Sequence, residues 1–454
     1  MPLVILGANS VSGGYEIDNS LRFNSGSSDE LTRTFPTDGN RKTFTFSCWH
    51  KRTVIGGASG QSLFFGDTAG TTNATQDSFY FGGSGNNQFI FGGWLSGIFT
   101  SNMLFRDVSA WYHIIVAVDT TQATSANRVR FYVNGVEQSY TSGAGYPAQN
   151  ADFGITKSGN HSWFGNDGQS GRGNGYLAEA YLIDGQQLTP SSFGETDQDT
   201  NIWKPIPYTG SFGTNGFYLQ FKNSASLGTD SSGNGNTFTV NNLTSIDQTT
   251  DTPTNNFSTL NSLDKHASLT PTEGNLAVSN GGGTWMPIKS TFAVSKGKWY
   301  CEAKITSGAD FPIAIYLSRL DGSSQSNMDS QRIYYNIDYS GGSIIATGVF
   351  TYEENSVGTS TTNDIIGMAL DCDNGTMKFY KNGSQLGSTV TNSAISSNEW
   401  MFGVQLNGDG VQFNFGNPMY SANSYTDGAG YGNFSYAVPS GYYALNTKNL
   451  ADYG

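Results

Sequence analysis

The sequence has few charged residues and no long hydrophobic run. Charged residues make up 13% of its 454 residues, and 23 Lys and Arg against 36 Asp and Glu give a formal net charge of −13. An acidic protein without a basic cluster repels phosphate backbones and anionic lipid head groups, so we expect no nucleic-acid partner. No segment approaches the roughly 20 apolar residues that a membrane-spanning helix needs, so we expect no membrane insertion.

Cysteine is almost absent. The three cysteines, Cys48, Cys301 and Cys372, lie inside apolar strand-like patterns, with no CxxC motif and no Cys/His cluster near them. These spacings fit no metal site, so we expect buried small side chains and no metal or other cofactor. A disulfide between Cys301 and Cys372 stays open at this stage.

The N-terminal residues lack the pattern of a secretion signal. Met1–Ala8 form a short apolar run, but no positively charged segment precedes it and Asn9 and Ser10 follow directly. This pattern is not typical of a secretion signal. We therefore expect a soluble protein that is made in a cytoplasm, even if it works elsewhere.

What the sequence does contain is typical of β-sandwiches. It has 58 glycines and 13% aromatic residues, with abundant Ser, Thr and Asn, and no long window shows helical periodicity. Each half contains a similar short motif, Arg130–Gly135 in the first and Lys378–Gly383 in the second. Both motifs end in the Asn-Gly pair of a tight type I′ hairpin. An apolar run precedes each motif, at Trp111–Asp119 and Asp364–Asp371. At this length, two β domains are expected.

The boundaries follow from changes in composition. Short strands with turn signals between them run through residues 1–208, and a second series runs through residues 285–454. Residues 209–284 between them are rich in Thr, Asn and Ser, and we interpret them as a connecting arm. The arm begins with a strand-like stretch, Phe217–Phe221, which we expect to add an edge strand to the first domain.

Both halves resemble known families. Through Thr43–Arg52, Trp111–Val116 and Phe131–Gly135, residues 15–200 resemble a laminin-G-like member of the concanavalin A superfamily. Through Gly297–Glu302 and Asp364–Gly383, the second half resembles a SPRY domain, and Asn363 stands where that family usually has Gly. The resemblance implies an all-β fold of two concanavalin A-like antiparallel β-sandwiches (jelly rolls) joined by a polar linker.

The tandem arrangement resembles virion proteins of tailed bacteriophages. That resemblance implies a non-enzymatic protein, made in the host cytoplasm and displayed on the virion surface as a tail fibre or similar component, where it adheres to a host-surface glycan or protein. The implied partners are other virion proteins and further copies of the chain in a homo-oligomer. The alternatives are a capsid decoration or cement protein, a polysaccharide depolymerase and a bacterial extracellular adhesin.

One polar loop is a candidate binding site. It contains His161, Trp163 and Asp167, and Arg172 follows shortly after. A Trp ring beside such polar groups can stack on a sugar face while they hydrogen-bond the hydroxyls. The alternative is that Trp163 packs under the rim of the sandwich. In the second domain, Thr351–Asn355 and the Tyr334–Tyr335 pair are candidates for a partner-binding rim, although core packing explains buried tyrosines equally well.

Two carboxylate motifs are weaker candidates. Glu16 and Asp18 resemble part of a glycosidase motif, but the third carboxylate is missing, so a solvated strand entry is expected and no catalytic residue is assigned. Asp371–Gly375 resembles the start of a calcium loop without its remaining ligands, so a hairpin turn is expected there. His113 lies in a strand-like run and is predicted to be a structural residue.

Overall fold

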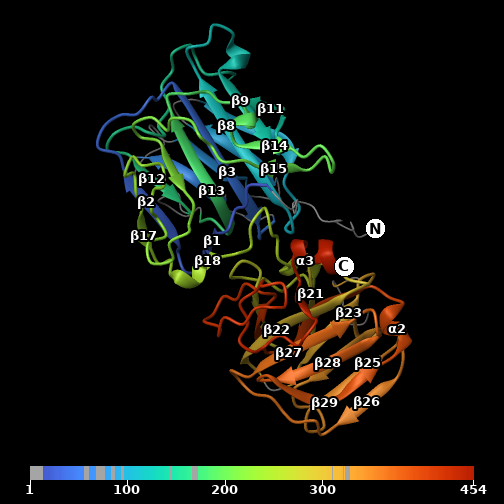
Figure 1. Cartoon of the computed structure of the whole chain (residues 1–454). Coiled ribbons are helices and arrows are strands. Elements are labelled where there is room, and N and C mark those ends of the chain that lie inside the picture. Colours follow the sequence, from blue (N-terminus) through green and yellow to red (C-terminus); the bar gives the residue numbers. More distant parts are fainter. Residues whose placement is uncertain are drawn as a thin grey trace. The chain divides into compact units, whose positions relative to one another are not determined.

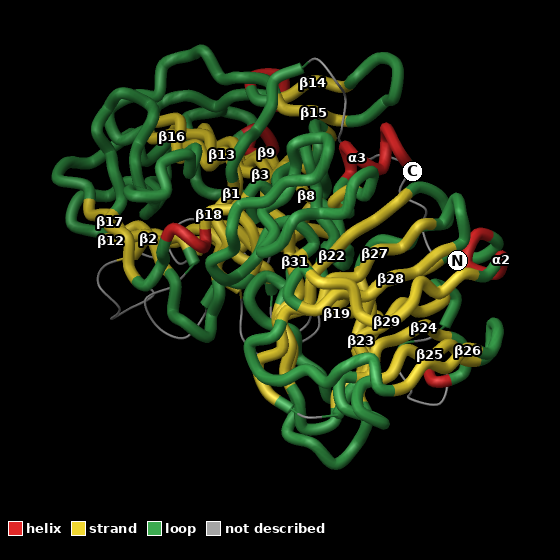
Figure 2. The backbone as a smooth tube through the Cα atoms, turned by 60° about the horizontal axis from the view of Figure 1, so that its bottom comes forward, coloured by secondary structure: helices red, strands yellow, loops and turns green. Residues whose placement is uncertain are grey.

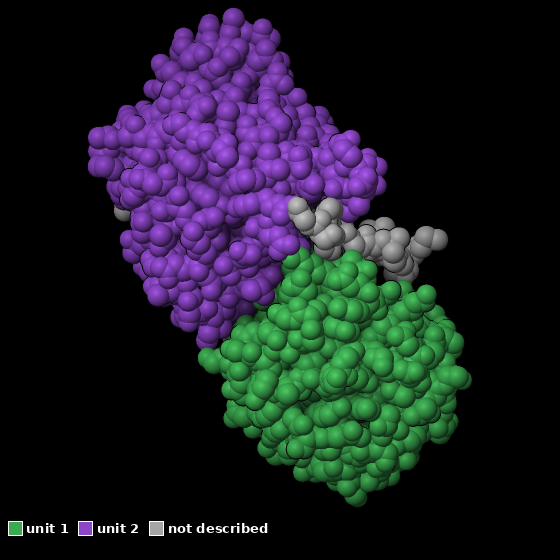
Figure 3. All heavy atoms as spheres, viewed as in Figure 1, with its two compact units in different colours: residues 1–10, 255–454 green, residues 11–254 purple. Residues whose placement is uncertain are grey.

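The computed structural model describes residues 14–55, 61–67, 77–82, 87–93, 97–142, 145–165, 172–308, 310–320, 322 and 328–454. The chain divides into an N-terminal unit, residues 11–254, and a C-terminal unit built from residues 255–454 (Figure 3). Strands dominate both units (Figures 1 and 2). No helix among the described residues is long and apolar enough to cross a membrane.

The N-terminal unit consists of two antiparallel sheets that pack face to face. The apolar run Trp111–Asp119 noted in the sequence forms a strand here. The first sheet has the order β10 (Val136–Glu137), β9 (Val129–Val133), β8 (Trp111–Asp119), β3 (Thr43–Arg52), β13 (Gly175–Asp184), β1 (Ser20–Phe23) and β18 (Gln248–Thr249), and β16 (Phe217–Leu219) also pairs with β13. The second sheet has the order β11 (Tyr140–Ser142), β7 (Gly97–Leu104), β6 (Gln88–Gly93), β5 (Asp77–Phe81), β4 (Gln61–Asp67), β12 (His161–Phe164), β2 (Glu30–Thr34) and β17 (Thr239–Asn241).

The core between these sheets is rich in phenylalanine, including Phe46, Phe79, Phe89 and Phe131. The outer face of the first sheet is covered as well. Later segments pack on it, including the short hairpin of β14 (Gly194–Thr196) and β15 (Trp203–Pro205), and Tyr181 contacts Phe193 there. The first sheet is therefore buried on both faces over much of its area.

The C-terminal unit is a second sandwich of two antiparallel sheets. One sheet has the order β19 (Leu260–Lys265), β21 (Met286–Ser290), β30 (Trp400–Leu406), β23 (Pro312–Leu317), β24 (Arg332–Asn336), β25 (Ser343–Thr347) and β26 (Tyr352–Asn355). The other has the order β20 (Ala277–Ser279), β31 (Gly410–Asn414), β22 (Lys298–Ser307), β27 (Ile365–Asp371), β28 (Thr376–Lys381) and β29 (Ser384–Thr391), with β32 (Tyr443–Ala444) parallel to β22. The described part of the unit also contains the short helices α2 (Ser393–Ser396) and α3 (Thr447–Tyr453). The expected all-β fold of two sandwiches is confirmed.

The segment expected as a connecting arm is divided between the two units. Residues 209–254 belong to the N-terminal unit and residues 255–284 to the C-terminal unit. Its polar side chains fix the backbone locally: Asp230 accepts hydrogen bonds from the backbone N–H of Tyr218 (2.9 Å) and of Asn236 (2.7 Å). Hydrogen bonding by short polar side chains thus orders a stretch that is poor in bulky apolar residues.

Both predicted Asn-Gly turns are present. Asn134 and Gly135 have φ values of 47° and 80°, and Asn382 and Gly383 have 48° and 81°, which fit a type I′ turn. Each Asn is also bound to the strand before the hairpin: Asn134 Oδ1 accepts from the backbone N–H of His113 (2.8 Å), and Asn382 Oδ1 accepts from that of Ile365 (2.9 Å). The two turns thus share both conformation and anchoring.

The beginning and the end of the N-terminal unit are held together at Ile17 and Thr254. The Thr254 hydroxyl accepts from the backbone N–H of Ile17 (3.1 Å) and donates to its carbonyl (3.0 Å). Nearby, Lys51 Nζ lies 2.7 Å from Asp251 in a fully buried ion pair, and the indole N–H of Trp111 donates to the same carboxylate (3.1 Å). Satisfied in this way, the buried charges fix residues 251–254 onto the first sheet.

The cysteines are buried free thiols, which answers the disulfide question. Cys301 on β22 pairs in register with Met368 on β27, whereas Cys372 follows the end of β27. Burial raises the pKa of all three thiols, that of Cys372 to about 12, so the thiolate form is suppressed.

Candidate binding site

Two of the four predicted binding residues lie in a strand. The sequence placed His161 and Trp163 in a polar loop, whereas the structure places both in β12, paired with β2 on one side and β4 on the other. The loop prediction was wrong. The Gly and Asn residues that flank this segment are typical of a loop, but the backbone partners that make it a strand come from β2 and β4, which are distant in sequence. Asp167 lies outside the described residues, as do the side chains of His161 and Trp163.

The loop after β12 has a closed base. The backbone N–H of Gly173 donates to the carbonyl of Gly165 (2.8 Å), so both ends of the loop meet. Asn174 then binds Ser25 twice: its Oδ1 accepts from the backbone N–H (3.0 Å) and its Nδ2 donates to the hydroxyl (2.9 Å). Arg172, half-buried, lies directly before these anchors. The loop therefore begins and ends at fixed points, where the two sheets meet.

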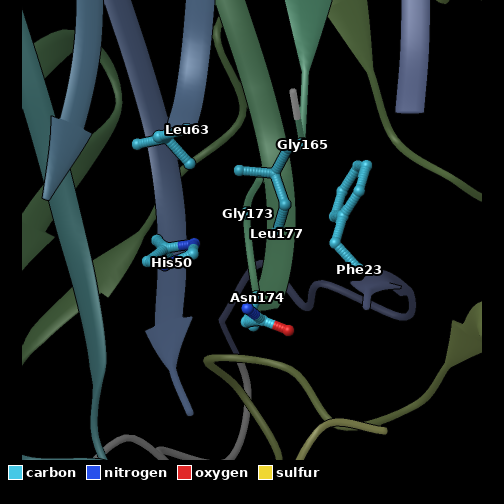
Figure 4. Close-up of a pocket in the computed structure, with 8 residues that line it drawn as sticks. Phe23, His50, Leu63, Gly165, Gly173, Asn174 and Leu177 are labelled. Carbon is cyan, nitrogen blue, oxygen red and sulfur yellow. The ribbon is translucent and has the colours of Figure 1, made fainter. Parts of the chain in front are cut away.

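A small pocket lies at this base, with space for about one water molecule (Figure 4). Its lining consists of Phe23, His50, Leu63, Gly165, Gly173, Asn174, Gly175 and Leu177. Close approach requires glycine at two of these positions, since a Cβ at Gly165 would lie 2.5 Å from the Phe23 ring and one at Gly175 would lie 2.4 Å from the Lys51 carbonyl oxygen. The pocket is mostly apolar.

His50 is the titratable residue of this lining. It is buried, its Nδ1 has no hydrogen-bond partner among the described residues, and its ring stacks on Phe81 with centroids 5.1 Å apart. Burial, together with the nearby Arg52 charge, lowers its pKa to about 3. A neutral imidazole in an apolar lining suits an uncharged group such as a sugar hydroxyl or methyl better than an ion.

A buried glutamate that the sequence did not single out lies on β13. Glu179 occupies a bulge with φ of 48° and is 4% exposed. The hydroxyls of Tyr15 (3.2 Å), Tyr218 (2.5 Å) and Tyr181 donate to its carboxylate. We call these four residues the hydroxyl clasp; it fastens the start of the unit and β16 to the first sheet. Burial raises the pKa of Glu179, against the effect of these hydrogen bonds.

The C-terminal unit contains a second buried glutamate. Glu302 on β22 accepts from the backbone N–H groups of Ser435 (2.9 Å) and Tyr436 (3.0 Å) and from the side-chain amide of Asn414 (3.1 Å). We call these four residues the amide clasp. Burial again raises the pKa of the glutamate. Both carboxylates are occupied by internal donors, so each serves to fasten a covering segment.

His113 is the structural residue that the sequence predicted. Its Nδ1 accepts from the indole N–H of Trp203 (2.9 Å), and its Nε2 lies 2.9 Å from the Ser47 hydroxyl. With Nδ1 as an acceptor, Nε2 carries the proton and donates to Ser47. Burial lowers the pKa of His113 to about 3, so the ring is neutral.

The carboxylate motifs have structural positions. Glu16 and Asp18 are exposed and precede β1. Asp371 pairs in register with Thr376 across a turn, and its carboxylate accepts from the backbone N–H of Asn374 (2.9 Å), which confirms the predicted hairpin. Within the described ranges, no group of three or more His, Cys, Asp or Glu residues could hold a metal ion.

The tyrosine pair of the second domain is divided between two environments. Tyr335 lies in the core, where its hydroxyl donates to the carbonyl of Gly358 (2.6 Å). Tyr334 is half-buried on the other face of β24, with the Arg332 guanidinium 4.2 Å from its ring centroid. Of this pair, only Tyr334 is left as a candidate for partner contact.

The sheets and motifs agree with two known families. Residues 24–192 match the Laminin_G_3 family, described as the concanavalin A-like lectin/glucanases superfamily, and residues 298–418 match the SPRY domain family. The chain carries one domain of each family. Both domain resemblances drawn from the sequence are thereby confirmed, and we use these family names for the two units from here on.

Solved structures similar to this chain include two SPRY domains. The crystal structure of the SPRY domain of human HERC1 shares 15% identity at a TM-score of 0.27 and covers 34% of this chain and 96% of its own. The crystal structure of the TRIM65 PSpry domain shares 14% identity at a TM-score of 0.28 and covers 35% of this chain and 88% of its own. Among curated proteins, no sequence matches this chain.

Proposed function

We propose that this chain is a non-enzymatic protein displayed on a phage virion, which adheres to a host-surface glycan or protein through its concanavalin A-like domain. The SPRY domain then serves as the contact module toward other virion proteins. The closed base of the loop between β12 and β13 is the observation that carries the proposal. Arg172 directly precedes Gly173, which lines the His50 pocket, and the hydrogen bond between Gly173 and Gly165 fixes the base from which a binding loop can be presented.

The chemistry around this loop favours an uncharged ligand group. The pocket combines apolar side chains with a neutral imidazole, and the adjacent Arg172 supplies guanidinium donors. A neutral glycan offers a hydroxyl or methyl group small enough for this pocket and further hydroxyl acceptors for the guanidinium. The occupied carboxylates of Glu179 and Glu302 support a role in binding rather than in bond cleavage.

Binding to cells and to capsids separates the main alternatives. Purified protein is mixed with host cells and, in parallel, with undecorated capsids. Saturable binding to cells supports adhesion, whereas binding to capsids alone supports the decoration protein and contradicts adhesion. Release of reducing ends from host polysaccharide would contradict the non-enzymatic part and support a depolymerase.

A substitution tests the loop itself. Arg172→Ala is expected to weaken cell or glycan binding at least about tenfold, which corresponds to about 1.4 kcal/mol. Arg319→Ala is the matched control, because Arg319 is exposed in the SPRY domain and contacts Asn398 and Gln331 there. Equal binding by both variants and the wild type would remove the loop from the proposal.

A further inference from the structure

The exposed apolar side chains of the concanavalin A-like domain are gathered at one edge. Among the described residues of this unit, four large hydrophobic side chains are exposed, and all lie in or close after β7, β10 and β11. They are Ile98 (53%), Leu104 (41%), Val136 (62%) and Tyr146 (45%). We call these four residues the edge patch. A concentration of apolar surface on one side of a soluble domain marks a contact site.

The same edge ends both sheets. Among the described strands, β10 pairs only with β9, and β11 pairs only with β7. Such end strands present unpaired backbone N–H and C=O groups, which proteins usually protect with charge or proline. Here β7 and β11 contain no charged residue and no proline, and Glu137 of β10 is neutralised by Arg130 at 3.0 Å. The edge is therefore open to pairing.

The edge patch is held in place from beneath. Asn102 of β7 is bound to Ser139 through both its backbone N–H (3.0 Å) and its side-chain amide (2.8 Å). The Tyr140 hydroxyl donates to the carbonyl of Val129 (2.6 Å), and the Tyr146 ring packs edge-on against Tyr140. Because the supporting residues are fixed, this surface loses little conformational entropy when a partner binds.

The chemistry of this edge favours a second copy of the chain as the partner. With a net charge of −13, two copies repel each other over most of their surface. The uncharged strands β7 and β11 escape this repulsion, and hydroxyls such as Thr100 and Thr141, which pair in register, can both donate and accept. Three of the four apolar side chains are aliphatic, which suits protein packing better than stacking on a sugar ring.

From these observations we propose that the edge formed by β7, β10 and β11 is a contact surface for a second copy of this chain. Antiparallel pairing of β11 with its counterpart across a two-fold axis continues the second sheet into the partner and brings the two edge patches together. This inference stands independently of the adhesion proposal, since it concerns neither the loop after β12 nor its ligand.

Solution mass is the first test. By sedimentation velocity, the wild type is expected to show a mass of twice 48.7 kDa at high concentration. The double variant Ile98→Lys/Leu104→Lys is expected to weaken dimerisation at least about 100-fold. Leu263→Lys is the matched control, because Leu263 is 56% exposed but lies in the SPRY domain. A monomeric wild type at every concentration, or a dimer that only the control dissociates, overturns the proposal.

Cysteine cross-linking supplies a second test that does not depend on tolerance of lysine. All native thiols are buried, so a cysteine introduced by Thr141→Cys is the accessible one. Under mild oxidation this variant is expected to form a covalent dimer. Gln385→Cys, on the exposed edge strand β29, is the control. Cross-linking of Thr141→Cys no greater than that of Gln385→Cys contradicts the pairing of β11.

Discussion

The two sandwiches fasten their covering segments with different chemistry. In the concanavalin A-like domain, the hydroxyl clasp surrounds Glu179 with three tyrosine hydroxyls. In the SPRY domain, the amide clasp surrounds Glu302 with N–H donors from Ser435, Tyr436 and Asn414. A hydroxyl can rotate and can donate or accept, whereas an N–H can only donate. The hydroxyl clasp should therefore tolerate changes that the amide clasp does not.

The Asn-Gly hairpins, unlike the two clasps, use the same chemistry in both domains. Their turns have the same dihedral angles and the same anchoring to the preceding strand. A different aromatic residue covers each glycine, Trp203 in one domain and Tyr436 in the other. Local turn chemistry is thus shared between the domains, while the parts that come from distant sequence differ.

The largest expected difference is between the two buried glutamates. Glu302→Gln directs an amide N–H₂ at N–H groups that can only donate, and the Tyr300 hydroxyl, at 3.4 Å, is too distant to accept well, so the free energy of unfolding should fall by about 2 to 3 kcal/mol. Glu179→Gln should cost less than about 1 kcal/mol, because the tyrosine hydroxyls can turn to accept. Denaturant unfolding of both variants measures this difference. Equal losses would show that donor type does not distinguish the clasps.

The turn glycines should come next. Both have φ near +80°, so Ala strains either turn, but a Cβ at Gly135 would lie 2.4 Å from Trp203 and one at Gly383 would lie 2.8 Å from Tyr436. Trp203 is also held by its hydrogen bond to His113. We expect Gly135→Ala to cost about 2 kcal/mol and Gly383→Ala about 1 kcal/mol in thermal unfolding. The reverse order would contradict the role of the anchored indole.

How far the sequence predicts an element of this fold depends on whether the residues that stabilise it are local or distant in sequence. Trp111–Asp119 is visible from its apolar run alone, because a buried central strand carries that signal in its own residues. The Asn-Gly turns were predicted from local turn chemistry. β12 was missed because its signal lies in β2 and β4, far away in sequence. Long-range partners are not visible in a local pattern.

The candidate site was less predictable than the fold. Aromatic and polar residues around Trp163 suggested a binding loop, but nothing local showed that Gly165 and Gly173 close its base or that His50 lines a pocket there. Glu179 and its three tyrosines come from three separate segments: the residues before β1, strand β13 and strand β16. The isolated Glu in the apolar run Gly175–Asp184 was the one available signal for that cluster.

The turn asparagines should show equal effects. Asn134→Ala removes the hydrogen bond to the N–H of His113, and Asn382→Ala removes that to the N–H of Ile365. Each substitution should lower the free energy of unfolding by about 1 kcal/mol. Hydrogen exchange at the two N–H groups would assign each loss to its own hairpin. A loss of stability in one domain alone would show that the two asparagine hydrogen bonds have the same geometry but contribute different free energies.

The smallest expected effect is a pH dependence. Burial raises the pKa of Glu179, so the folded chain binds this proton more tightly than the unfolded chain. The corresponding stability is complete at acidic pH and is lost as pH rises above the ordinary carboxyl value through the raised one. The melting temperature of Glu179→Gln should therefore gain on the wild type as pH rises from about 4.3 toward neutrality. A wild type that instead gains on the variant as pH rises, or a difference that does not change with pH, would mean that the hydroxyls keep Glu179 ionised.

The bonds between Ile17 and Thr254 have a consequence for how such a chain can evolve. The beginning and the end of the concanavalin A-like domain lie side by side. A protein that received the domain in a surface turn would therefore need to widen that turn very little. A gene segment that encodes it can be inserted into, or removed from, a surface turn of another protein without separating the flanking strands. Recombination can therefore exchange this domain as a cassette.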